Sequence, residues 1–151
     1  MLTPHLIFGA AIASKISNPF LALPLAFLSH FLLDMLPHDE YSIENVKKKR
    51  WNKSFFDFLK VFGDISFGFL LLYLFSGKEA IIFAGAFAAM APDGITLFSI
   101  IFPKNKLTAL HQKPHMAANT IGDRDENKKI PLWGAIIGQI AIIIISIFLL
   151  R

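Results

Sequence analysis

The sequence predicts an all-α integral membrane protein, a helical bundle of four full membrane spans plus a short N-terminal helix. Of its 151 residues, 54% are hydrophobic and only 17% are charged, which is less charge than a soluble domain of this length usually carries. Two apolar runs, 80–102 and 130–150, reach the ~20 residues needed to cross the hydrocarbon layer of a bilayer. The basic residues gather in two long segments between apolar runs. We expect residues 1–151 to form a single transmembrane domain.

Proline and glycine set the expected ends of each helix. The predicted helices are 4–17, 19–36, 55–75, 79–102 and 131–150. The first should end at Asn18-Pro19 and the second at Pro37, because proline lacks the backbone N–H that continues a helix. The third should end before Gly77. We expect Pro92 to interrupt the fourth helix. The fifth contains no ionisable group, so we predict an anchoring role for it.

The distribution of Lys and Arg predicts the orientation in the membrane. Segments 38–54 and 103–130 hold eleven basic residues, against three in the opposite connections and at the C-terminal end. Because cytoplasmic loops are enriched in Lys and Arg, we predict that both segments are cytoplasmic loops of a multi-pass protein of the cell (inner) membrane. The N-terminus would then be cytoplasmic and the C-terminus outside. The same explanation accounts for the net charge of +4, so we expect no nucleic-acid partner.

The densest group of chemically active side chains closes the second predicted helix. His30 and Asp34 are four residues apart, so they project from one helix face and can bind one ion. Pro37 should turn the chain so that His38 comes back toward them. The alternative is a simple hydrogen bond between His30 and Asp34 at a helix end. Ionisable groups inside an apolar run are costly and usually functional, which favours the metal site.

Two aspartates lie within later apolar runs. Asp64 and Asp93 are each about 13 Å below the predicted cytoplasmic surface, at a rise of about 1.5 Å per residue. Asp64 is either a catalytic group or a protonated carboxyl bonded to another helix. Asp93 lies at the expected helix interruption and either acts at an ion site or caps a kink.

The remaining histidines fall on the same predicted side of the membrane. His111 and His115 lie in the second basic segment, where Pro114 favours a turn. They are either site residues or incidental loop histidines. His5 opens the first helix at the cytoplasmic face, and the predicted topology makes it a further metal ligand. The chain has no cysteine, so any metal must be held by imidazole and carboxylate.

Two further patterns concern partners. The basic run Lys47, Lys48, Lys49 and Arg50 is typical of a juxtamembrane segment that binds anionic lipid head groups, and a topology signal explains it equally well. Residues 134–138 begin and end with glycine, which fits close helix packing either within the chain or in a homo-oligomer.

The order of these motifs resembles that of the membrane-bound metal-dependent hydrolases of bacteria and archaea, a family distantly similar to zinc-dependent phospholipases C. Those small multi-span proteins begin with a histidine followed by a Gly/Ala-rich helix, as His5 and Gly9 do here. Their early Pro-Asp-x-Asp-His-like element corresponds in position to residues 36–39, in altered form. Their later paired-histidine element corresponds to His111 and His115. The resemblance implies a metal-dependent hydrolase without naming its substrate.

We therefore expect a membrane metallohydrolase that acts on a lipid-type phosphoester or acyl substrate at the cytoplasmic face. The expected metal ligands are His5, His30, Asp34, His38 and His111, and the expected catalytic groups are Asp64, Asp93 and His115. The ion would be divalent, with zinc expected before manganese or magnesium. The alternative is a small cation or proton transporter or channel that uses Asp64 and Asp93. The apolar outer halves of the third and fourth helices favour a one-sided site over a pore.

Overall fold

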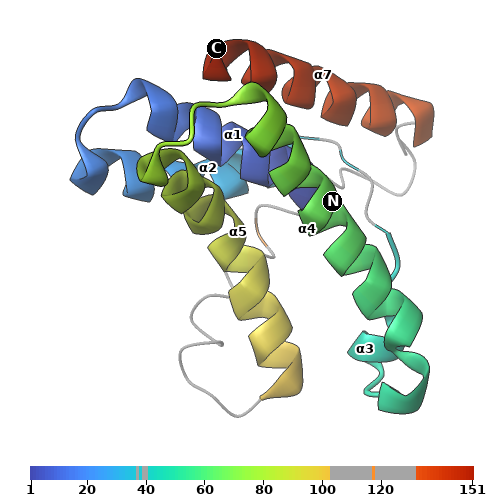
Figure 1. Ribbon diagram of the computed structural model, residues 1–151. Helices are drawn as coiled ribbons and strands as arrows, with labels where there is room; N and C mark the ends of the chain where they lie inside the picture. Colours follow the sequence, from blue (N-terminus) through green and yellow to red (C-terminus); the bar gives the residue numbers. More distant parts are fainter. Residues whose placement is uncertain (37, 39–40, 103–116, 118–131) are drawn as a thin grey trace.

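The computed structural model describes residues 1–36, 38, 41–102, 117 and 132–151. All the regular structure in these residues is helical, as the sequence predicted (Figure 1). The helices are α1 (Leu2–Lys15), α2 (Pro19–Asp34), α3 (Glu44–Lys47), the 3-10 turn η1 (Trp51–Lys53), α4 (Phe55–Phe75), α5 (Ala80–Ile101) and α7 (Leu132–Leu150).

Three helices in the described residues, α4, α5 and α7, are long and apolar enough to cross a membrane, which is consistent with a membrane protein. The predicted fourth span is not confirmed, since α2 ends at Asp34 and has only 16 residues. A helix of that length is about 24 Å long, shorter than a hydrocarbon layer of about 30 Å.

The predicted interruption of the fourth helix is wrong. Helix α5 runs unbroken from Ala80 to Ile101, with Pro92 inside it. Proline removes one backbone hydrogen bond, but the Pro92 ring is fully buried, and neighbouring helices in such a bundle can make up for the lost bond. Asp93 is therefore a residue on the surface of a continuous helix and does not lie in a broken segment.

The short helix α1 forms the centre of the structure. It packs against α2, α4, α5 and α7, and most of its residues are buried. Leu6, Ile7 and Ala10 have no exposed surface, and they form the hydrophobic core together with Leu72 of α4 and Ala86 of α5. Figure 1 shows α7 lying across the bundle while α4 and α5 extend away from α1. Among the described helices longer than two turns, the shortest is thus the one that α2, α4, α5 and α7 surround.

Helix α1 approaches α5 very closely through a pair of glycines. A Cβ atom added to Gly9 would lie 2.3 Å from the Cβ of Ala89 and 2.7 Å from the carbonyl oxygen of Gly85. A Cβ atom added to Gly85 would lie 2.4 Å from the Cβ of Ala13 and 2.7 Å from the carbonyl oxygen of Gly9. Small residues four apart on both helices, Gly9 with Ala13 and Gly85 with Ala89, let the two backbones meet. Only glycine fits at the two central positions.

The basic segment before α4 is held in a defined turn. The Asp57 carboxylate accepts hydrogen bonds from the backbone N–H groups of Asn45 (2.8 Å) and Val46 (3.2 Å) at the start of α3. Lys49 lies just after the C-terminal end of α3 and has a positive φ of 53°. The Arg50 N–H donates back to the carbonyl of Asn45 and closes this helix end. Asp57 thus acts as a helix cap supplied from α4.

Candidate metal centre

The last turn of α2 carries the first two groups of the candidate site. His30 and Asp34 are one helical turn apart and share a face, as their spacing predicted. Both are buried, with 0% and 2% of their surfaces exposed. The His30 Nε2 atom lies 3.2 Å from Oδ2 of Asp34. Since burial of an ionisable pair is costly, the two side chains must satisfy each other or share a cation.

A main-chain carbonyl of α5 fixes the orientation of the His30 ring. The Nδ1 atom lies 2.9 Å from the carbonyl oxygen of Ala89, and only a protonated nitrogen can donate to that oxygen. In the neutral ring the lone pair is therefore on Nε2, which faces Asp34 and Asp93. Metal-binding histidines are commonly oriented in this way, with the second ring nitrogen bonded to a carbonyl or carboxylate.

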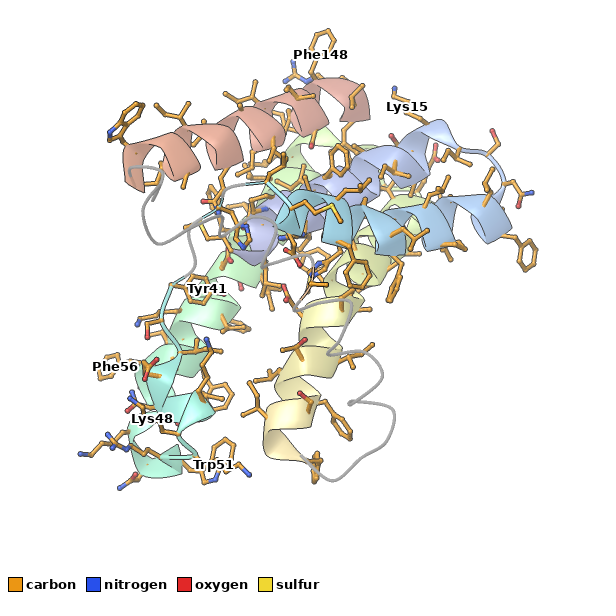
Figure 2. The ribbon with its side chains drawn as sticks, turned by 180° about the vertical axis from the view of Figure 1, so that it is seen from behind. Lys15, Tyr41, Lys48, Trp51, Phe56 and Phe148 are labelled. Atoms are coloured by element: carbon orange, nitrogen blue, oxygen red, sulfur yellow. The ribbon has the colours of Figure 1, made fainter. Side chains whose placement is uncertain are left out.

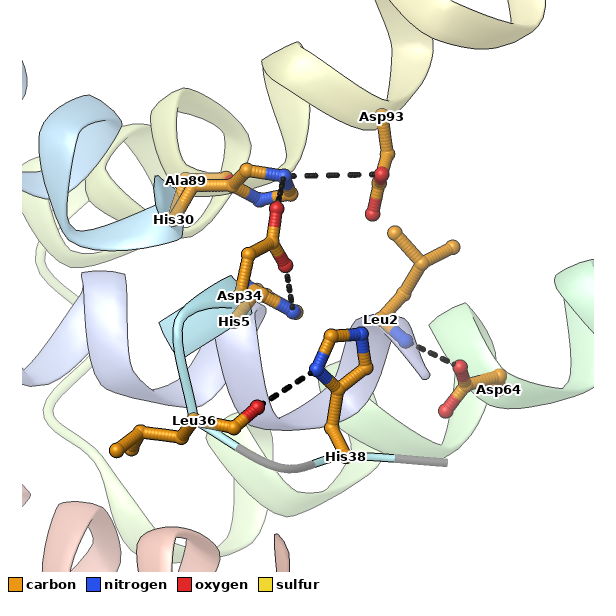
Figure 3. A network of polar contacts seen from close by, with 9 residues as sticks. All are labelled: Leu2, His5, His30, Asp34, Leu36, His38, Asp64, Ala89 and Asp93. Atoms are coloured by element: carbon orange, nitrogen blue, oxygen red, sulfur yellow. Dashed lines mark hydrogen bonds and ion pairs between the residues drawn. The ribbon is translucent and has the colours of Figure 1, made fainter. Parts of the chain in front are cut away.

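Helix α1 supplies the third group of the site. His5 is buried in the first turns of α1, and its Nε2 atom lies 3.5 Å from Oδ1 of Asp34. The rings of His5 and His30 have centroids 4.3 Å apart and are tilted by 36°. Figure 3 shows the Asp34 carboxylate between the two imidazoles, with one oxygen directed toward each. His5 and His30, which are 25 residues apart in the sequence, therefore meet at the carboxylate of Asp34.

The separations between these groups fit a shared divalent ion. One ligand atom from each of His5, His30 and Asp34 lies within 4.8 Å of the others. Atoms bound about 2.0–2.2 Å from a zinc ion at tetrahedral angles stand about 3.3 Å apart. The distances from His30 Nε2 to Oδ2 of Asp34 (3.2 Å) and from His5 Nε2 to Oδ1 of Asp34 (3.5 Å) are close to that value, each to a different carboxylate oxygen. They are also longer than most charged hydrogen bonds, which are about 2.7–2.9 Å.

Asp93 lies at the rim of this group. Its Oδ1 atom is 3.7 Å from Nε2 of His30, and its side chain is 34% exposed, whereas the Asp34 side chain is almost fully buried. Figure 3 shows it approaching His30 from the α5 side. A second carboxylate beside the same nitrogen can complete a coordination sphere or accept a proton from a molecule that enters the site.

Asp64 has a different set of contacts. Its carboxylate accepts hydrogen bonds from the backbone N–H groups of Leu2 (2.5 Å) and Thr3 (3.3 Å) and from the Thr3 hydroxyl (2.5 Å). No side chain of α1 itself caps this end of the helix. In Figure 3 Asp64 lies on the far side of Leu2 from His30. The described contacts make Asp64 the N-terminal cap of α1, supplied from α4.

Among the described residues, His38 is a predicted metal ligand that does not belong to this group. His38 bonds through Nδ1 to the carbonyl oxygen of Leu36 (2.9 Å) and is not among the three residues whose ligand atoms lie together. His111 and His115 lie outside the described residues. Their predicted roles, and that of Asp64 in catalysis, stay predictions.

Sequence patterns did not reveal two partners of the predicted site residues. The Ala89 carbonyl orients His30, but a main-chain oxygen leaves no signature in the sequence. Thr3 binds Asp64, and its only signal is its place before Pro4 at the start of a helix. The small-residue pairs on α1 and α5 could have predicted the close contact that brings Ala89 to this place.

The chain was compared with known families, proteins and structures. No family model, no curated protein and no solved structure matches it.

Proposed function

We propose that this protein is a membrane metal-dependent hydrolase that acts on a lipid-type phosphoester or acyl substrate at the cytoplasmic face. The observation that carries the proposal is the buried meeting of His5, His30 and Asp34, with ligand atoms from two helices within 4.8 Å of one another. Two neutral imidazoles and one carboxylate are a donor set that zinc accepts, and manganese is the next candidate.

The residues around this group divide into two roles. His5, His30 and Asp34 are buried and would hold the ion, while the Ala89 carbonyl keeps the His30 lone pair directed at it. Asp93 is partly exposed and adjacent, so it would serve as a further ligand or as the general base that accepts the proton of the attacking water. A bound divalent ion would polarise the scissile group and lower the pKa of a bound water. His38, His111 and His115 remain candidates for further ligands or proton carriers.

Exposed aromatic side chains support a lipid substrate. The half of α4 that precedes Asp64 exposes Phe55, Phe56 and Phe62, each by more than 65%. Beyond Asp93, Phe98 of α5 and Phe102 just after the helix are exposed. At about 1.5 Å per residue, each helix end extends about 12 Å beyond its aspartate, so apolar surface flanks the approach to the site. A substrate with acyl or polyprenyl chains could keep those chains in the bilayer while its polar ester reaches Asp93.

The turn before α4 supports an additional contact with lipid head groups. Lys47, Lys48, Lys49 and Arg50 are all exposed on it, and exposed Trp51 follows them. Figure 2 shows Lys48, Trp51 and Phe56 together at one end of the molecule. Basic residues beside aromatic ones are typical of segments that lie on an anionic membrane surface.

The alternative function, a cation or proton transporter, receives less support from the described contacts. That function requires Asp64 and Asp93 to share a path through the membrane. Asp64 instead binds the first backbone N–H groups of α1, and Asp93 faces His30. A carboxylate that caps a helix is poorly suited to load and release a cation repeatedly.

Metal analysis of purified protein tests the proposal. Detergent-purified wild type would be supplemented with zinc, manganese or magnesium, passed through a desalting column and analysed for bound metal. We expect about one equivalent of zinc in wild type, none in Asp34→Asn, and full occupancy in Asp64→Asn, which serves as a matched control. Absence of metal from folded wild type would overturn the proposal. Loaded protein would then be assayed with a phospholipid and with its water-soluble head-group ester, and we expect hydrolysis of the lipid only.

A further inference from the structure

A second site lies at the other end of α1, between its last turn and the end of α7. A cavity of about 250 Å³ is lined by Phe8, Ala11, Ile12, Lys15, Ile16 and Leu149. Five of these six side chains are apolar, and the sixth is a lysine with a long aliphatic stem. Its volume is below that of most drug-sized ligand sites, so the cavity fits a narrow apolar chain better than a ring system.

This cavity is separate from the candidate metal centre. Lys15 follows His5 by ten residues, which is about 15 Å along the axis of α1. Figure 2 shows Lys15 and Phe148 at one end of the molecule and Lys48, Trp51 and Phe56 at the other. The two sites can therefore be tested independently.

The charge at the mouth of the cavity points to an anionic ligand. Lys15 is exposed at the last turn of α1, and no ion pair of its ammonium is found in the part of the chain that the structure describes. Two other basic groups near helix ends lie over aromatic rings: Lys78 over Tyr73 (4.7 Å) and Arg151 over Phe75 (5.3 Å). Lys15 contacts no aromatic ring in this way among the residues that the structure describes, and it lines the apolar cavity.

We propose that this cavity binds one acyl chain of an anionic phospholipid and that the Lys15 ammonium binds its phosphate. The apolar lining accounts for the chain, because removing apolar surface from water or from loose lipid contacts favours a fitted cavity. The ammonium accounts for the phosphate, because a charge-assisted hydrogen bond to phosphate is stronger than one to a neutral group. A soluble phosphate would use only the lysine, and a lipid without phosphate, such as diacylglycerol, would use only the apolar lining of the cavity.

Native mass spectrometry of delipidated protein in detergent tests this proposal. The probes are phosphatidylglycerol and diacylglycerol with identical acyl chains, added singly and in competition. We expect one phosphatidylglycerol per chain and a preference over diacylglycerol of about five-fold or more. Lys15→Gln should abolish the preference while leaving weak binding of both lipids. Leu149 lines the cavity and is partly exposed, so Leu149→Trp can place a larger ring in the cavity. This variant should remove binding of both lipids.

Lys78→Gln is the matched control, because it removes a charge near another helix end without touching the cavity, and we expect wild-type lipid binding. Equal binding of the two lipids by wild type, or equal loss of preference in Lys15→Gln and Lys78→Gln, would overturn the proposal. Each variant is first checked for wild-type thermal unfolding. If Leu149→Trp unfolds, Leu149→Phe takes its place.

Discussion

Asp34 and Asp64 are the same residue type in the same kind of apolar helix, and the structure gives them different partners. Asp34 lies between the imidazoles of His5 and His30, whereas Asp64 accepts hydrogen bonds from Leu2 and Thr3. The first arrangement brings together groups that bind cations. The second satisfies donors that the start of any helix leaves unpaired. An acidic residue in an apolar run is therefore evidence of a buried polar contact. Its partners decide whether that contact can bind a cation or only stabilises the fold.

Helix α1 connects the two regions, so displacing it should damage both. In Gly9→Leu the new side chain would meet Ala89 and the Gly85 backbone, and we expect a loss of unfolding free energy of about 3 kcal/mol or more, with no metal bound. Thermal unfolding in detergent measures this. Gly63→Ala is the control, since nothing lies within 4 Å of its added Cβ atom. Its Tm should equal that of wild type or be slightly higher. Equal Tm values for Gly9→Leu and wild type would contradict the close packing of α1 on α5.

Asp34→Asn separates metal binding from folding. The amide keeps the shape of the side chain but removes the negative charge that two imidazoles face, so zinc affinity should fall by more than about 100-fold. The measurement is competition with a fluorescent chelator, with Tm of the apoprotein recorded in parallel. Wild-type zinc affinity in a folded Asp34→Asn variant would show that the ion binds elsewhere.

Asp64→Ala should have the opposite effect. It leaves the backbone N–H groups of Leu2 and Thr3 without their acceptor, and we expect a loss of about 2 kcal/mol in unfolding free energy, the upper end for a helix cap. Metal stoichiometry of the folded fraction should stay near that of wild type. If Asp64→Ala instead loses metal at unchanged Tm, Asp64 belongs to the site and the contrast with Asp34 fails.

Glu44 is an exposed acid, and replacing it should change thermal stability less than replacing Asp34 or Asp64. The Lys48 side chain bonds to Glu44 (2.5 Å) and lowers the pKa of Glu44. A lowered acid pKa adds stability above the ordinary pKa and loses it as the pH falls toward the lowered value. Since the pair is exposed, solvent screens it, and Glu44→Gln should unfold at the wild-type temperature at pH 7. A clear loss of Tm at pH 7 that disappears near pH 3 would show that the pair contributes more than expected.

Local features of the fold follow from the sequence. Helix α4 has the predicted bounds, and α7, which is described from Leu132 onward, ends at the predicted residue. The sequence can predict such helix ends because glycine and proline act on the residues next to them. The pairing of His30 with Asp34 also follows from a four-residue spacing on one helix. The predicted break at Pro92 was wrong because an apolar helix of a membrane-type bundle can continue through a proline when its neighbours compensate.

Only the tertiary structure decided which distant residues meet. The sequence predicted His5 to be a metal ligand only through the expected topology. Its contact with Asp34 depends on α1 lying at the centre, and that position depends on the close approach of Gly9 to Gly85. The same packing directs Asp64 to the start of α1 and the Ala89 carbonyl to His30. Helix formation is set by neighbours along the chain, whereas contacts between residues 29 to 62 positions apart are set by how helices fit together, which no local pattern specifies.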